Sequence, residues 1–395
     1  MLGLVLTAGG ARGAYQAGVL KRIGESPVLG TRPFPFPIVT GASAGAINGV
    51  LVAAADDLRT ATSRLADLWA TLEVDRVFRT DSLALGLTAF RFARDLALGG
   101  LIGAGNIHSL LDASPLHDLI RAEFPKGGIA EGIRTGRLFA VGISATSYHS
   151  GRSFTFVQGR PGHPLWRKSR RVAVPVELDA DHVCASAAIP IVFPPVQIRS
   201  EAGESYFGDG GLRLVTPLSP AIRLGATRLF AIGIRCPGAA DSLSRQELRA
   251  GEETTPSHFA TTPPPLAQVC GVFLNAIFLD HLDADLDHLR RMNDLVRGRA
   301  PDSMTEAPPP SEPMRIVEAI SINPSADLAI VARAFAERMP RIVRYVLDGL
   351  GTPDAQSADL MSYLLFDSRY TRALVDIGYQ DAGARIGEIE SLLAG

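Results

Sequence analysis

The feature that most constrains the fold is a serine in a run of small residues, Ile38-Val39-Thr40-Gly41-Ala42-Ser43-Ala44-Gly45-Ala46-Ile47-Asn48. Its apolar start predicts a buried strand that stops at Gly41, and its small residues predict a helix to about Ala55. In so sharp a strand-to-helix turn, the serine backbone is strained and side chains at Gly41 and Gly45 would clash. Two interpretations stay open: Ser43 is a nucleophile at a helix N-terminus, where N–H groups favour negative charge, or it caps a helix packed on a strand.

Composition limits the class of protein. The 395 residues suffice for one large core with an appendage, or for two domains. With 46% hydrophobic and 20% charged residues the chain is globular, and a net charge of −2 argues against nucleic-acid binding. The three cysteines are far apart and include no C-x-x-C pair, so we expect no disulfide framework, no zinc site and a reducing compartment.

Hydropathy bears on location. The apolar run 2–6 has no basic segment before it and is too short for a signal peptide. The most apolar longer stretch, 266–279, contains Gln268 and Asn275 and falls short of the roughly 18–20 apolar residues that a spanning helix needs. We therefore expect a cytoplasmic protein, with membrane association left open.

A second glycine-rich stretch follows the first apolar run. Residues 2–6 predict a core strand, Ala8-Gly9-Gly10-Ala11-Arg12-Gly13 a loop, and 14–23 a helix, which together form half of a βαβ unit. A dinucleotide fingerprint fits poorly, because Ala8 replaces its first glycine and the second strand ends without an acidic residue. The alternative is an oxyanion hole, in which backbone N–H groups stabilise the charge that develops on an acyl oxygen.

The later elements follow from periodicity and breaks. Helices are expected at 61–72 and 109–124, strands at 137–146, 153–158, 227–234 and 315–322, and helices again over 266–296 and 326–393. The stretch 84–107 is interpreted as a buried helix pair or as a flap that meets lipid. We expect a catalytic domain at 1–240, a linker at 241–265 and a mainly helical extension at 266–395, with a proline-rich break at 298–313.

The base that would serve Ser43 is open between two designs. His258, His281 and His288 follow Asp209-Gly210-Gly211 and formally complete a Ser–His–Asp order. Against this, the serine turn comes after only about two strands and no H-G-G-G-type loop is present. The second design has two residues: a desolvated Asp209 carboxylate takes the serine proton directly.

Three motifs in order carry a resemblance to a family. The glycine loop (Gly9, Gly10, Ala11, Arg12, Gly13), the serine turn between Gly41 and Gly45, and Asp209 with Gly210 and Gly211 resemble those of the patatin-like phospholipases. The flanks Ala185-Ser186-Ala187-Ala188-Ile189-Pro190 and Phe193-Pro194-Pro195-Val196 are similar too, and Ser186 itself is interpreted as packing. The tail around Ser362-Tyr363-Leu364-Leu365-Phe366-Asp367 is similar to that of bacterial members.

The resemblance implies a three-layer α/β/α patatin-like fold with a mainly parallel central sheet and a mostly helical C-terminal region. It implies a lipid acyl hydrolase of phospholipase A type, with Ser43 as nucleophile, Asp209 as general base, an oxyanion hole formed by the glycine loop, and no cofactor or metal. The expected partner is a lipid or acyl-ester substrate, with peripheral membrane contact left open and no nucleic acid. The alternatives are an acyltransferase or thioesterase with the same dyad, and a catalytically idle lipid-binding module.

Overall fold

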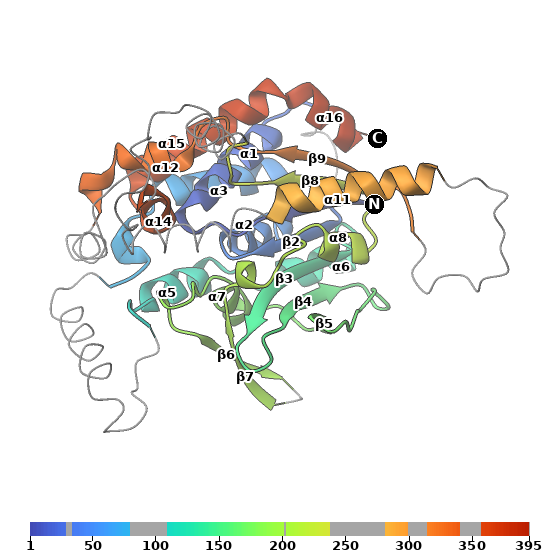
Figure 1. Ribbon diagram of the computed structural model, residues 1–395, viewed down its shortest axis with the longest axis horizontal. Helices are drawn as coiled ribbons and strands as arrows, with labels where there is room; N and C mark the ends of the chain where they lie inside the picture. Colours follow the sequence, from blue (N-terminus) through green and yellow to red (C-terminus); the bar gives the residue numbers. More distant parts are fainter. Residues whose placement is uncertain are drawn as a thin grey trace, which may run out of the picture.

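The computed structural model describes residues 1–28, 34–79, 109–200, 203–237, 281–298, 314–339 and 357–394. In these ranges nine strands form one sheet (Figure 1), with the order β5-β4-β3-β2-β1-β8-β9, and a β6–β7 hairpin joins it through β3. The strands are β1 (Leu2–Leu6), β2 (Ile38–Ala42), β3 (Ala140–Ser147), β4 (Ser153–Gly159), β5 (Arg171–Pro175), β6 (Val196–Ser200), β7 (Gly203–Gly208), β8 (Arg228–Ile232) and β9 (Glu318–Ile322).

The centre of the sheet is parallel and buried on both faces. β3, β2, β1, β8 and β9 are paired in parallel, with Leu4 opposite Val39 on one side and Phe230 on the other. Every residue of β1 and β2 is buried, as expected for near-continuous apolar strands in a parallel sheet. β2 and β8 lie on opposite sides of β1, so the strand order reverses at β1. In an open parallel sheet, such a reversal leaves a crevice at the carboxyl ends of the strands.

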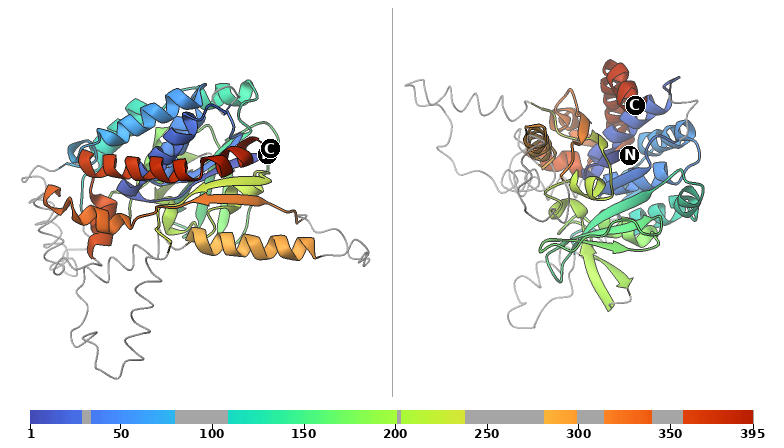
Figure 2. Two further views of the ribbon diagram at one scale, coloured as in Figure 1. Left: turned by 90° about the horizontal axis from the view of Figure 1, so that it is seen from above. Right: turned by 90° about the vertical axis from the view of Figure 1, so that its right-hand side faces the viewer.

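Helices cover both faces of the sheet. They are α1 (Gly13–Gly24), α2 (Ala44–Ala53), α3 (Leu58–Ala70), α5 (Ser114–Glu123), α6 (Gly128–Arg134), α7 (Ala180–Ser186), α8 (Ser219–Arg223), α11 (His281–Arg297), α12 (Leu328–Arg333), α14 (Ser357–Leu364), α15 (Ser368–Ala384) and α16 (Ile386–Ala394), with 3₁₀ turns η1 (Gly10–Arg12), η2 (Val74–Arg76), η3 (Gly210–Leu212) and η4 (Ala336–Arg338). In Figure 2, α11 lies on one side of the sheet, and α3 and α15 lie on the other.

Two hydrophobic clusters correspond to these two faces. The larger contains buried residues of α1, α2, α3 and α15, and the smaller contains Leu218 and Ala221 near α8 and Leu282 and Leu286 of α11. The predicted three-layer α/β/α fold with a mainly parallel sheet is therefore confirmed. No helix in the described ranges has the length and apolar character to cross a membrane.

The C-terminal region packs against the N-terminal helices. β9 is the strand expected at 315–322 and lies at the sheet edge. α15 crosses α1 so closely that a Cβ at Gly18 would lie 2.0 Å from the Val375 carbonyl oxygen, and one at Gly378 would lie 2.2 Å from that of Tyr15. The mostly helical character of this region is confirmed. The domain boundaries remain predictions, and the stretch 84–107 and the linker 241–265 lie outside the described residues.

One helix begins later than its pattern predicts. The segment 109–124 is helical only from Ser114, because the N–H groups of Leu110 and Leu111 donate to the carbonyls of Ile191 and Val192. Asp112 then accepts a hydrogen bond from the Ser114 N–H at the start of the helix. Hydrogen bonds to a segment 81 residues further along the chain thus replace the first turn of the predicted helix.

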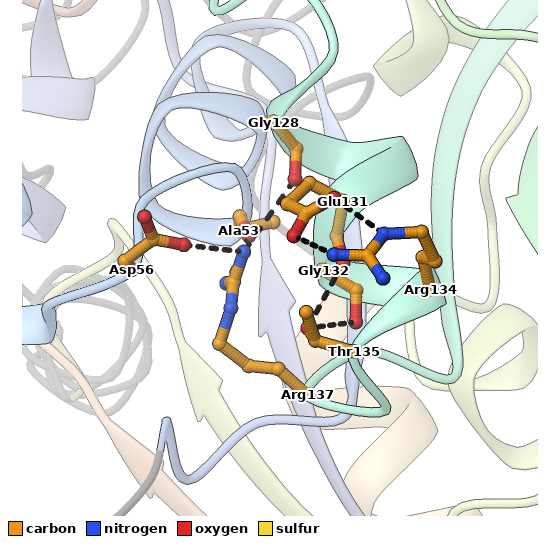
Figure 3. Close-up of polar contacts among 8 residues, drawn as sticks. All are labelled: Ala53, Asp56, Gly128, Glu131, Gly132, Arg134, Thr135 and Arg137. Atoms are coloured by element: carbon orange, nitrogen blue, oxygen red, sulfur yellow. Dashed lines mark hydrogen bonds and ion pairs between the residues drawn. The ribbon is translucent and has the colours of Figure 1, made fainter.

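Arg137 anchors the far end of α2 (Figure 3). Its Nη1 donates to the Ala53 carbonyl oxygen at 2.7 Å, and its guanidinium lies 3.7 Å from the Asp56 carboxylate. Its side chain is 11% exposed, whereas Arg134, paired with Glu131 in the same view, is 72% exposed. A cation at a helix C-terminus stabilises the last carbonyls of that helix.

We expect Arg137→Ala to lower the free energy of unfolding by about 2 kcal/mol, because the buried carbonyl loses a charged donor. Urea denaturation measures this change. Arg134→Ala is the matched control and should cost less than about 0.5 kcal/mol, since its ion pair is exposed. Equal costs for the two variants would contradict the role given to Arg137.

Candidate active site

Ser43 occupies a strained turn between β2 and α2. Its backbone has φ 54° and ψ −126°, in the region that disfavours L side chains, and its side chain makes no capping hydrogen bond. A Cβ at Gly41 would lie 2.3 Å from the Gly45 carbonyl oxygen, and one at Gly45 would lie 2.3 Å from that of Leu6. These contacts explain both glycines, and the interpretation of Ser43 as an ordinary helix cap is wrong.

The glycine loop forms the short turn η1 beside this serine. Gly10 has φ 52°, and a Cβ at Gly13 would lie 2.5 Å from the Cβ of Ala44, so the turn packs on the start of α2. The Arg12 N–H donates to the Gly9 carbonyl, and the Gly13 N–H donates to carbonyls within the turn. Among the described residues the N–H groups of Gly10 and Ala11 have no backbone acceptor.

A buried polar network fixes the glycine turn relative to the serine. Asn48 of α2 donates from Nδ2 to the Gly13 carbonyl oxygen and to Gln16 Oε1, both at 3.0 Å. The Trp69 indole donates to Asn48 Oδ1 at 2.8 Å, and Gln16 donates to the Thr7 carbonyl at 2.9 Å. Satisfied networks of this kind hold their members in one arrangement.

Asp209 follows β7 and is buried in the same crevice. Its N–H donates to the Ala188 carbonyl at 2.9 Å, and its carbonyl accepts from Thr146 Oγ1 at 2.8 Å. Its carboxylate Oδ1 accepts from the Gly211 N–H at 2.7 Å. Its Oδ2 is buried and has no hydrogen-bond partner in the described part of the chain.

The electrostatics of Asp209 follow from this burial. Burial raises the pKa of the Asp209 carboxyl to about 7, while the interactions with the Ser43 side chain and the Gly211 N–H lower it. Together with the unpartnered Oδ2, this describes a Ser43 hydroxyl close to the carboxyl without a hydrogen bond of regular geometry. A base whose pKa lies near neutrality suits proton transfer at neutral pH.

Ser186 holds the backbone of the serine turn. Its Oγ accepts from the Ser43 N–H at 2.9 Å and donates to the Ser144 carbonyl at 2.6 Å, and its side chain is fully buried. The sequence interpretation of Ser186 as mere packing missed this contact. No local signal could have revealed it, because it joins residues 143 positions apart.

Helix α14, the first helix after residue 356, packs on the glycine turn. Arg12 is buried, its Nε donates to Ser362 Oγ at 2.8 Å, and its guanidinium carbon lies 4.4 Å from the centre of the Tyr363 ring. A Cβ at Gly10 would lie 2.5 Å from the Tyr363 carbonyl oxygen. The tail motif, to which the sequence assigned no chemistry, therefore packs directly on the predicted oxyanion loop.

An apolar cavity opens beside Ser43, which we call the elbow cavity. It is narrow, about 60 Å³, and Glu123 is the one carboxylate among its lining residues. The lining residues are Gly10, Ser43, Ala44, Ile47, Val50, Leu51, Leu68, Trp69, Leu72, Leu116, Leu119, Ile120, Glu123, Phe124, Val183, Ala187, Ile189, Phe193 and Phe366. Such a lining suits an alkyl chain and excludes polar groups.

Of the three histidines considered for a Ser–His–Asp triad, one lies near the site, one lies beside α11 and one is outside the described residues. His281 lines a small separate hollow with Ala42 and Gly211, His288 lines a cavity beside α11, and His258 is not among the described residues. The described partners of Ser43 and Asp209 include no histidine. Within the described ranges no three His, Cys, Asp or Glu side chains gather as a metal site would require.

Folds that hold a serine at positive φ between a parallel strand and a helix form the nucleophile-elbow class of α/β proteins, to which this chain conforms. A family model narrows the class: the model described as Patatin-like phospholipase matches residues 4–222, more than half of the sequence. The chain belongs to the patatin-like phospholipase family, and the predicted resemblance is confirmed. Membership supports a lipid hydrolase.

Solved structures give more distant likenesses. VipD from Legionella pneumophila is 13% identical with a TM-score of 0.33, and the match covers 99% of this chain and 66% of VipD. Human GIVD cytosolic phospholipase A2 is 11% identical with a TM-score of 0.41, over 100% of this chain and 59% of that one. The chain thus spans less than two thirds of either protein. A comparison with curated proteins finds no match.

Proposed function

We propose that the protein hydrolyses carboxylic ester bonds of lipids through an acyl-enzyme on Ser43, with Asp209 as the general base. The observation that carries the proposal is the buried Asp209 carboxyl, with an unpartnered Oδ2 and a pKa of about 7, beside the strained Ser43. A carboxyl this costly to bury is more readily explained by proton transfer than by stability.

In the acylation step, Ser43 Oγ attacks the ester carbonyl carbon and its proton passes to Asp209. The carbonyl oxygen becomes an oxyanion, which the N–H groups of Gly10 and Ala11 would stabilise, since neither has a backbone acceptor among the described residues. The bond to the alcohol then breaks, and the alcohol leaves with the proton from Asp209. The acyl group remains on Ser43 with its alkyl chain in the elbow cavity.

In the deacylation step, Asp209 takes a proton from a water molecule as the water oxygen attacks the acyl carbon. The bond to Ser43 Oγ breaks, Ser43 recovers the proton, and a free carboxylic acid is released. One carboxyl therefore serves both half-reactions as base and then as acid.

The rate of hydrolysis is expected to depend on pH through Asp209. Because only the ionised carboxylate accepts a proton, kcat/KM for an uncharged ester should rise with pH and level off above an apparent pKa of about 7. Initial rates at constant ionic strength across this range measure the profile. A rate already at its plateau near about pH 5 would contradict the role of Asp209.

Covalent labelling tests the nucleophile directly. An alkyl fluorophosphonate should react with Ser43, and mass spectrometry of the digested protein should find the adduct on the peptide that contains it. Heat-denatured protein is the control and should not react. An intact folded protein that hydrolyses no ester and takes up no label would favour the idle lipid-binding alternative.

A further inference from the structure

A second cavity continues the elbow cavity along α2. This outer cavity, of about 390 Å³, shares only Leu51, Leu68 and Glu123 with the elbow cavity. The elbow cavity follows α2 from Ser43 to Leu51, and the outer cavity follows the chain onward from Leu51 to Asp57. The three shared residues therefore form a partition between the elbow cavity and the outer cavity, which follow one another along α2.

The lining changes character at this partition. On the Ser43 side the residues from α2, α3 and α5 are almost all apolar, whereas the outer cavity adds Asp56, Asp57, Thr60 and Arg64. Arg64 of α3 and Glu123 of α5 form an ion pair at 2.7 Å, with side chains 75% and 25% exposed. An alkyl chain that crossed the partition would meet charged and hydroxyl groups, whose desolvation is unfavourable.

The distance from Ser43 to the partition sets a length. Leu51 lies eight residues after Ser43, and at about 1.5 Å per residue of helix the partition stands about 12 Å along α2. An extended chain advances about 1.2 Å per bond, which is a third of the rise of an extended residue. An acyl chain of about ten carbons would thus reach from Ser43 to the partition.

We propose that Leu51 and Leu68 act as a stop that selects medium-length acyl chains, with the Arg64–Glu123 pair closing the gap between α3 and α5 behind them. The inference rests on the proposed ester hydrolysis. Leu51 and Leu68 are partly buried and pack against the main hydrophobic cluster. Replacing both by alanine removes the partition and joins the elbow cavity to the larger outer one.

The test is a chain-length series of p-nitrophenyl esters from acetate to palmitate, dispersed below their aggregation limits. With the wild-type protein, kcat/KM should rise by up to about fourfold for each added methylene and stop rising near ten carbons. With Leu51→Ala/Leu68→Ala the rise should continue, so that the ratio of kcat/KM for fourteen carbons to that for ten increases at least about tenfold.

Two further variants keep the test decisive if the double variant unfolds. Leu51→Trp narrows the passage, and should lower kcat/KM for octanoate and decanoate esters, so that the optimum moves to shorter chains. Ile47 lies one turn from Ser43, on the Ser43 side of the partition. Ile47→Ala should change kcat/KM for all chain lengths without moving the optimal chain length.

The outcomes separate the two proposals. A wild-type protein without esterase activity would overturn the proposed function. An active protein whose optimum stays at the same length in both Leu51→Ala/Leu68→Ala and Leu51→Trp would overturn the chain-length stop alone. An optimum that shifts in opposite directions in these two variants supports it.

Discussion

Ser43→Ala is expected to lower kcat for ester hydrolysis by at least about 10³-fold, because the proposed nucleophile is removed and the remaining groups act only as a unit. The fold should persist, since the Ser43 hydroxyl makes no capping hydrogen bond and alanine needs no more space. Circular dichroism and urea denaturation check the fold, and initial rates check the activity. A variant that is folded and retains full activity would exclude Ser43 as the nucleophile.

Ser186→Ala is expected to lower the activity less than Ser43→Ala does. It leaves the proposed nucleophile in place but removes the acceptor of the Ser43 N–H, and an unsatisfied buried donor costs about 1–3 kcal/mol. We expect kcat to fall while KM changes little, because the turn loses its support and the alkyl cavity does not. Loss of activity equal to that of Ser43→Ala would show that the two serines act inseparably.

Asp209→Asn is expected to abolish activity and at the same time to stabilise the protein. In the folded state burial raises the pKa of Asp209 from 3.8 to about 7, so the folded state keeps a proton that the unfolded state releases. The native protein therefore loses stability as pH rises from about 4 to about 7, and above that range the loss amounts to about 4 kcal/mol. Asparagine has no charge to bury and avoids this loss.

The measurement compares free energies of unfolding of wild-type and Asp209→Asn proteins at several pH values. The advantage of the variant should be largest near about pH 8, roughly halved near pH 5, and absent well below pH 4. Asp179→Asn is a suitable control, because interaction with His182 lowers the pKa of this half-exposed carboxyl despite its partial burial. That variant should be no more stable than the wild type at any pH.

The sequence predicts well those parts of the fold that depend on neighbouring residues. The strands at 2–6 and 38–41 and the glycine–serine turn follow from apolar runs that end at small residues, and β1, β2 and α2 lie where these patterns place them. Gly41 could be explained before the structure was known, since the clash that it avoids is with the Gly45 carbonyl oxygen, within five residues of chain. The clash that Gly45 avoids is with the Leu6 carbonyl oxygen of β1, a contact that only the fold creates. Site residues defined by a local turn are therefore accessible to sequence reasoning.

What could not be predicted depends on contacts between distant segments. The shortened start of α5, the hydrogen bond from Ser43 to Ser186 and the contact of Arg12 with Ser362 join residues 81 to 350 positions apart. Likewise, the sequence suggests that a carboxylate follows β7, but the burial that tunes Asp209 comes from elements across the sheet. The family resemblance marks the stretches that contain Ser186 and Ser362, but the sequence does not show which residues these two serines contact.

The packing of α14 on the glycine turn has a consequence for biosynthesis. A chain still attached to the ribosome contains Ser43 and Asp209 well before Ser362 and Tyr363 have been made. Until that helix docks, Arg12 lacks its hydrogen-bond acceptor and Gly10 lacks the backbone that packs against it. We therefore expect nascent chains, and chains truncated before Ser362, to lack ester-hydrolase activity, so that the proposed activity would appear only after α14 has been made and has docked.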